Sequence, residues 1–192
     1  AEPALRELFE QNRSRELGTR ALAALARVGD PAQADLLREL LSSNDPEHRR
    51  LAVEGLARVS QPSARPEFEV GFQREGNADV RMAYAFGIAR LGGRSFLDTL
   101  VLPLGGGGRR AERANGLLLE LGPGIAPDLY AYLNDPDAGV RGSVAELLAA
   151  LGDKEAVPRL QPLIADPDSR VADRANRAIR RLSRDGAGTS TP

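Results

Sequence analysis

Apolar residues recur along this chain at the three-to-four-residue spacing of amphipathic helices, and the helical segments come in pairs. The clearest pair lies in residues 135–164, where Asp135 and Pro136 open a turn before the first apolar series. Gly152 ends that series, because glycine readily adopts the left-handed conformation that closes a helix. A second, shorter apolar series completes the unit. Two helices of this size cannot bury their apolar faces alone, so the unit predicts neighbours of the same kind.

The same unit recurs along the chain with a nearly fixed period. The last aliphatic residue of each longer helix returns every 30 to 32 residues, at Val28, Val59, Leu91, Leu121, Leu151 and Leu182. An aliphatic residue stands three positions before each of these anchor residues, and a mostly small residue stands seven positions before. A period of this length indicates a helical repeat array, and small residues allow adjacent helices to approach closely.

Six helix pairs are therefore expected. They span residues 3–11 with 14–28, 31–43 with 46–59, 63–74 with 78–91, 94–103 with 109–121, 125–133 with 137–151, and 154–165 with 168–182. We expect a repeat domain over residues 1–183 and a small, polar, disordered tail over residues 184–192.

The segment before residue 109 departs most from the pattern, because Pro103 and the glycines 105–108 replace the usual Asp-Pro turn. The glycine run fits a flexible hinge or a backbone-lined anion site, and it also fits a loose loop between repeats. No Lys-Ser/Thr follows it, so it is not a P-loop, and we favour the loop.

The pattern DPDxxVRxxxAxxLxxLGDxxAVPxL in residues 135–160 resembles HEAT repeats, particularly the HEAT-like type of the phycobilin lyases. The resemblance covers nearly the whole chain and implies an all-α, right-handed α-solenoid whose longer helices line a concave face. It also implies an acid–arginine ladder between repeats, which Asp135 with Arg141, Asp79 with Arg81 and Asp45 with Arg49 fit. Alanine replaces this arginine at positions 111 and 172, so the expected ladder is incomplete. The family's mid-helix proline recurs as Pro66, Pro127 and Pro158.

The amino-acid composition limits the kinds of functional site that the chain can form. The chain has no cysteine, which excludes disulfides and Cys-ligated metals, and a single histidine, His48, which we expect to be structural or exposed. No apolar run approaches the roughly 20 residues that a membrane span needs. We therefore expect no catalytic residue, no metal, no cofactor and no membrane partner. The sequence leaves the cellular compartment open, although the cytoplasm is favoured. A processed N-terminus is compatible with the Ala-Glu-Pro start. We expect the chain to be a monomer.

Candidate partner-binding residues follow from the helical period, because positions one, five and eight before each anchor point away from the aliphatic stripe. Arg27, Arg58 and Arg90 should form a positive row with Phe86 beside it as an aromatic anchor. Glu120 and Glu146 then reverse the sign. The complete set is Arg20, Arg27, Glu54, Arg58, Phe86, Arg90, Arg113, Glu120 and Glu146.

Three functions fit this surface. Arginine and aromatic residues dominate protein interfaces, so the row predicts a scaffold that grips another protein or an acidic peptide, although it also fits an ordinary solvated face. A nucleic-acid partner fits the arginines but not the net charge of −1 or the acidic break. A lyase-type enzyme is the third possibility. The basic last helix fits a polar cap that keeps a terminal repeat soluble.

Overall fold

The computed structural model describes residues 2–184, and all regular structure in that range is helical. The chain divides into two compact units, Ala1–Leu97 and Asp98–Pro192, and each is described by itself. The prediction of an all-α solenoid built from helix pairs is confirmed. The expected extent of the repeat domain, residues 1–183, stays a prediction. The tail expected to be disordered lies outside the described residues, apart from Arg184 at the end of the last helix.

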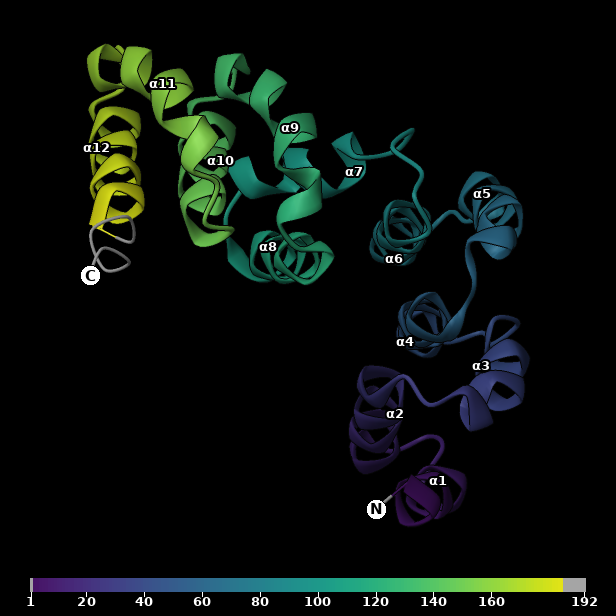
Figure 1. Ribbon diagram of the computed structural model, residues 1–192. Helices are drawn as coiled ribbons and strands as arrows, with labels where there is room; N and C mark the ends of the chain where they lie inside the picture. Colours follow the sequence, from purple (N-terminus) through teal and green to yellow (C-terminus); the bar gives the residue numbers. More distant parts are fainter. Residues whose placement is uncertain (1, 185–192) are drawn as a thin grey trace, which may run out of the picture. The chain divides into compact units, whose positions relative to one another are not determined.

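The first unit consists of three helix pairs in two layers (Figure 1). One layer contains α2 (Glu16–Val28), α4 (Pro46–Val59) and α6 (Ala78–Arg90), which we call the inner helices, and α4 packs against both of the others. The other layer contains α1 (Glu2–Gln11), η1 (Pro31–Gln33) with α3 (Ala34–Leu40), and η2 (Pro62–Ala64) with α5 (Arg65–Arg74).

The second unit repeats this plan with more broken outer elements. Its inner helices are α8 (Gly108–Leu121), α10 (Ala138–Ala150) and α12 (Ser169–Arg184), and α10 packs closely on α12 (Figure 1). The outer elements are α7 (Asp98–Val101) with η3 (Leu102–Gly105), η4 (Pro123–Ile125) with α9 (Ala126–Leu129) and η5 (Tyr130–Asn134), and η6 (Lys154–Ala156) with α11 (Val157–Leu160) and η7 (Gln161–Ala165).

Side-chain caps explain where the inner helices begin. Asp45, Asn77 and Asp137 each accept a hydrogen bond from the backbone N–H two residues later, at 2.9, 2.9 and 2.6 Å. These bonds satisfy N–H groups that have no partner inside the helix. At the other end of α2, Gly29 has a φ of 67°, a conformation that favours glycine.

The burial of side chains shows which positions of each repeat form the core. The residue three before the anchor is buried in five of the six inner helices, whereas the anchor Val28 is 53% exposed. The position seven before is also buried wherever it is small. In α6 that position is Tyr84, and its ring packs where a Cβ on Gly71 of α5 would stand, so a glycine opposite compensates for the larger side chain.

The predicted mid-helix prolines are in a different place. Pro66, Pro127 and Pro158 stand in the first turn of α5, α9 and α11, each directly after a 3₁₀ turn. The mid-helix assignment is wrong because the outer segments change from 3₁₀ to α geometry there, and a first turn tolerates a residue without an N–H.

The arginine ladder joins successive repeats, but through other acids than expected. Arg141 donates two hydrogen bonds of 2.8 Å to the Asp166 carboxylate and one of 2.8 Å to the backbone carbonyl of Asp135. Arg49 bonds Glu75 in the same way, at 2.9 and 3.1 Å, and the backbone carbonyl of Ser43 at 2.8 Å. The acid comes from the turn of the following repeat because the arginine already occupies the carbonyls of its own turn.

The third expected pair is corrected as well, since the guanidinium of Arg81 lies over the Phe72 ring, 4.5 Å from its centroid.

The glycine run is tightly packed at its first residue. A Cβ on Gly105 would lie 2.8 Å from a carboxylate oxygen of Asp137, and a Cβ on Gly139 would lie 2.7 Å from the carbonyl oxygen of Gly105. Gly107 and Gly108 have φ values of 67° and 69°, and Gly107 precedes α8 as an N-cap without a side-chain hydrogen bond. The run therefore forms a close contact with the start of α10 at Gly105, and space is open around Gly107 and Gly108.

Candidate partner-binding surfaces

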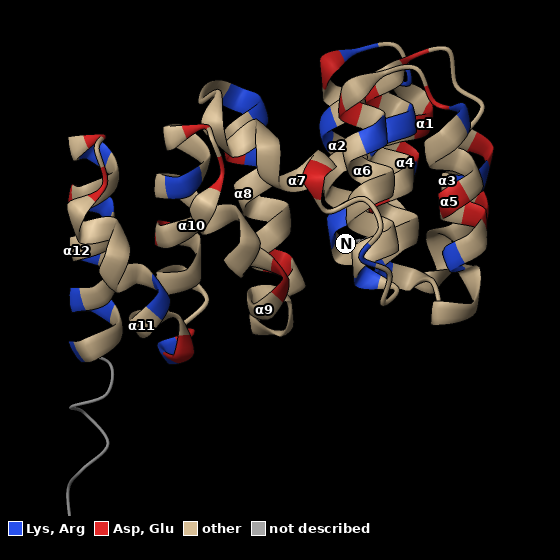
Figure 2. Cartoon of the chain, turned by 90° about the horizontal axis from the view of Figure 1, so that it is seen from above, with Lys and Arg blue, Asp and Glu red and all other residues tan. Residues whose placement is uncertain are grey.

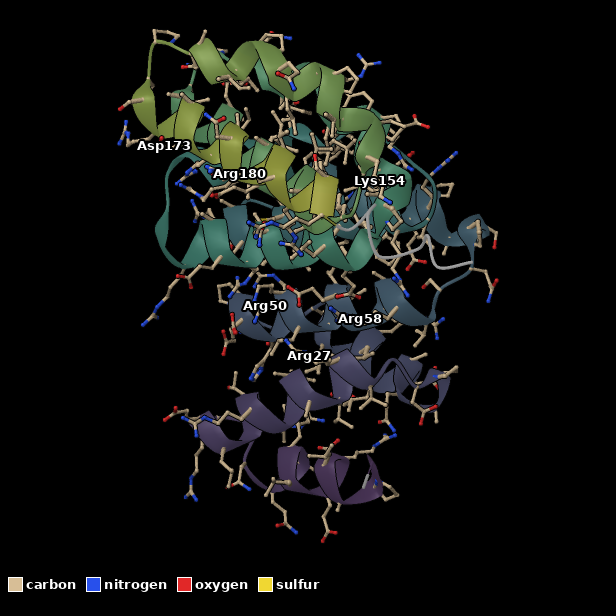
Figure 3. All side chains as sticks on the ribbon, turned by 60° about the vertical axis from the view of Figure 1, so that its left-hand side comes forward. Arg27, Arg50, Arg58, Lys154, Asp173 and Arg180 are labelled. Atoms are coloured by element: carbon tan, nitrogen blue, oxygen red, sulfur yellow. The ribbon has the colours of Figure 1, made fainter. Side chains whose placement is uncertain are left out.

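The inner helices of the first unit each carry an arginine in their last turn: Arg27 on α2, Arg58 on α4 and Arg90 on α6. We call these three residues the arginine row. Arg27 and Arg90 are exposed and Arg58 is half-buried. Figure 3 shows Arg27 and Arg58 on their adjacent helices. A cation in the last turn also stabilises the helix dipole, so each arginine has a local structural role.

Arg58 is fixed by two contacts. Its Nη1 donates to the backbone carbonyl of Ala26 at 3.0 Å, and its guanidinium lies 5.4 Å from the centroid of the Phe86 ring. Phe86 is 0% exposed, so the expectation of a solvent-facing aromatic anchor is wrong. The ring instead supports Arg58 from below, and it holds the centre of the row in one position.

Glu54 is also buried, at 7% exposure, where it accepts a 2.6 Å hydrogen bond from Arg50. The expectation that Glu54 faces solvent is therefore wrong, as it is for Phe86, and helix packing explains both. The helix α4 has α2 and α6 beside it and α3 behind it, and α6 packs against α4 and α5, so most of α4 and α6 is covered by neighbouring helices. Arg20, on α2 at the end of the layer, is exposed and pairs with Glu16 at 2.5 Å.

The remaining candidates belong to the second unit. Arg113 is half-buried and Glu120 is exposed on α8. Glu146 on α10 accepts a 2.9 Å hydrogen bond from Arg177 and lies 3.8 Å from Nε of Arg174, both on α12. Glu146 therefore connects two neighbouring helices. Figure 2 shows how acidic and basic residues are distributed over the elements.

His48 is largely buried, with an aromatic ring and a carboxylate beside it. Its ring lies edge-on to Phe9, with 5.7 Å between ring centroids, and its Nε2 is 3.7 Å from the Asp45 carboxylate. The side chain is 10% exposed. Across residues 2–184, no group of three or more His, Cys, Asp and Glu side chains could hold a metal ion. No helix in that range is long and apolar enough to cross a membrane.

One pocket was not anticipated. It has a volume of about 60 Å³ and lies among α3, α4, α5 and α6, with Val53, Leu56, Phe68 and Tyr84 in its lining. Burial raises the pKa of the Tyr84 hydroxyl, and the nearby carboxylates of Glu75 and Glu67 add to the effect. The lining comes from four helices, so no local sequence pattern could indicate it.

A comparison with protein-family models agrees with this architecture. A family model described as "HEAT repeats" matches residues 2–89 and 113–187. Among solved structures, an engineered protein is 20% identical, with a TM-score of 0.43, and the match covers 94% of this chain and 97% of the other. Human deoxyhypusine hydroxylase in complex with glycerol is 17% identical, with a TM-score of 0.38 and coverage of 88% and 80%. A comparison with curated protein sequences finds no match.

Proposed function

Because the chain belongs to the HEAT repeat family, we propose that it is a non-catalytic scaffold that binds a partner polypeptide along the arginine row. The observation that carries this proposal is that Arg27 and Arg90 are exposed on the helices that flank α4, with Arg58 fixed between them. Arginine is enriched at interface hot spots because its planar fork pairs bidentately with carboxylates.

The spacing of the row suits an extended, acidic segment. Adjacent packed helices lie about 8–10 Å apart, so Arg27 and Arg90 are separated by roughly 16–20 Å. An extended chain advances about 3.3 Å per residue, so five to six partner residues would span the row. Carboxylates near both ends of such a segment would meet Arg27 and Arg90, while Arg58, bonded to Ala26, stays fixed between them.

The test compares affinity capture from the native organism by the wild-type chain and by the Arg27→Glu/Arg90→Glu variant. We expect a protein that the wild type retains and the variant loses. Arg58 is left intact, because replacing it would remove the bonds to Ala26 and Phe86 and so disturb the fold. The control, Arg6→Glu/Arg15→Glu, makes the same change in net charge at other exposed positions of the first unit.

Two outcomes would count against the scaffold. If both double variants retain every captured protein, the arginine row is not the binding surface. If the wild type captures only nucleic acid, and loses it steeply as salt rises, phosphate contacts carry the binding and the nucleic-acid function replaces this one.

A further inference from the structure

The last helix, α12, concentrates positive charge in a chain whose remaining residues are acidic overall. It contains six arginines and one aspartate, whereas the whole chain has a net charge of −1. Arg177, Arg180, Arg181 and Arg184 are all exposed, and we call them the arginine stripe. Figure 3 marks Arg180 on this helix, and Figure 2 colours its basic residues blue.

The four arginines share one face of the helix. Their spacing is i, i+3, i+4 and i+7, which places them side by side over two turns, or about 10 Å of helix length. Among the described residues, these four side chains line a surface hollow of about 500 Å³. Within the described part of the chain, the lining of the hollow therefore consists of arginine side chains from one helix.

The acids near α12 pair with its arginines as far as Arg177, the first residue of the stripe. Asp168 pairs with Arg170 at 2.7 Å, and Glu146 on α10 pairs with Arg177 at 2.9 Å and approaches Arg174 at 3.8 Å. Arg180 donates to the backbone carbonyl of Asn176. Within residues 2–184, no carboxylate lies within ion-pair distance of Arg180, Arg181 or Arg184. Among the described residues, the stripe arginines without a carboxylate partner are thus Arg180, Arg181 and Arg184.

A polar cap for a terminal repeat does not require this arrangement. Mixed charges would keep the outer face soluble, and the first half of α12 already uses them. Like charges at i, i+3 and i, i+4 repel one another, and this repulsion opposes the stabilisation that Arg181 and Arg184 give to the helix dipole in the last turn. A bound anionic partner would relieve the repulsion.

We propose that the arginine stripe binds an acidic segment of a partner polypeptide, with its carboxylates seated in the hollow between the four guanidinium groups. Guanidinium forks pair bidentately with carboxylates, and they lose less hydration than ammonium groups when they do so. This surface is on α12 in the second unit and is independent of the arginine row in the first, so either proposal can fail alone.

A polypeptide fits this surface better than a nucleic acid. Glu146 lies against Arg177, and Asp173 is on the same helix, so a continuous phosphate backbone would meet negative charge beside the stripe. A length of about 10 Å admits few phosphate contacts, and such contacts supply most of nucleic-acid affinity. The helix also has no aromatic side chain on which a base could stack.

Fluorescence anisotropy with a labelled decaglutamate peptide at about 50 mM salt tests the proposal. We expect the wild-type chain to bind, and Arg181→Glu/Arg184→Glu to bind roughly tenfold or more weakly, since two attractive contacts become repulsive. Arg6→Glu/Arg15→Glu makes the same change in net charge elsewhere and should stay within about twofold of wild type. Neutral Arg181→Gln/Arg184→Gln should fall between the two.

Thermal melts separate binding from folding. Relief of like-charge repulsion and loss of the interaction with the helix dipole oppose each other, so the Tm of Arg181→Gln/Arg184→Gln should change little, and weaker peptide binding by this variant would then not reflect unfolding. The proposal is overturned if the wild type does not bind the peptide, or if the two glutamate variants lose affinity equally. It is also overturned if a single-stranded oligonucleotide binds through Arg181 and Arg184 while the peptide does not.

Discussion

At the scale of single residues, the two arginines that join successive repeats, Arg49 and Arg141, should contribute more to folding stability than any exposed ion pair does. Arg141 and Asp166 are 13% and 6% exposed, and two parallel hydrogen bonds join them. Asp166 also accepts the backbone N–H of Asp168 at 2.9 Å, so this one pair fixes the turn before α10 relative to the turn before α12. Bidentate, partly desolvated pairs of this kind are the strong class of ion pair.

A double-mutant cycle should reveal this strength. Arg141→Leu leaves the Asp166 carboxylate without its positive counter-charge, and Asp166→Asn leaves the Arg141 guanidinium without its negative counter-charge. Each change should therefore lower the free energy of unfolding by about 2–4 kcal/mol. The two costs should not add, because the double variant leaves neither charge stranded. Urea denaturation measures all four proteins. The exposed pair Arg20–Glu16 is the reference, with an expected coupling below about 0.5 kcal/mol, and equal couplings would contradict the argument.

The same pair predicts an acid-sensitive melt. The hydrogen bond from Arg141 lowers the pKa of Asp166, as the one from Arg49 lowers the pKa of Glu75. A carboxyl whose pKa is lower in the folded state contributes stability above its unfolded pKa of about 4, and loses it as pH falls through the folded value. The Tm should thus drop as pH falls from about 5 towards 3, and less steeply in Asp166→Asn. Parallel curves for the two proteins would disprove the linkage.

At the scale of elements, glycines set how closely the inner helices approach one another. A Cβ on Gly87 of α6 would lie 2.4 Å from a ring carbon of Phe68 and 3.3 Å from the Cβ of Ala57 on α4. Gly116 of α8 is equally central in its helix, but no atom lies within 4 Å of a Cβ added there. The two positions therefore separate the packing effect of glycine from its poor helix propensity.

Alanine substitutions at these two positions should change stability in opposite directions. Gly116→Ala should stabilise the chain by roughly 0.5–1 kcal/mol, because alanine favours the helix and meets nothing. Gly87→Ala should destabilise it by about 1–3 kcal/mol, because the rigid Phe68 ring must move. Thermal unfolding followed by circular dichroism measures both. Stabilisation by both variants would mean that α4, α5 and α6 are less closely packed than described.

The extent to which sequence predicts these elements depends on the kind of signal. The helix pairs were predictable because caps such as Asp45 and Asp137, and the aliphatic positions such as Leu148, are local patterns. The burial of Phe86 and Glu54 was not, because helical period alone cannot show how closely α4 and α6 pack against each other and against their outer helices. Glycine in a helix also looks like a defect until the facing ring of Phe68 is known.

The exposure of the candidate binding residues was predictable only where it follows from their position in the repeat. Arg27 and Arg90 are exposed, as their place one residue before each anchor indicates. Arg58 shares that place, yet it is fixed by Ala26 and Phe86, which lie about 30 residues away in the chain and become neighbours only through stacking. A ladder of Asp135 with Arg141 was inferred from closeness in sequence, whereas the carboxylate that Arg141 binds, Asp166, belongs to the next turn.

At the scale of the whole molecule, stability in a repeat array is a sum of contacts between neighbours. Leu148 of α10 and Leu22 of α2 are both 0% exposed, and they belong to different compact units. Leu148→Asp places a charge in a core that offers no counter-charge, so the packing between α10 and α12 should be lost. Hydrogen exchange followed by mass spectrometry should show lost protection in α10 to α12, while α2 and α4 keep theirs. Leu22→Asp should give the converse pattern, and uniform loss of protection along the chain in either variant would show that the array unfolds as a single cooperative body.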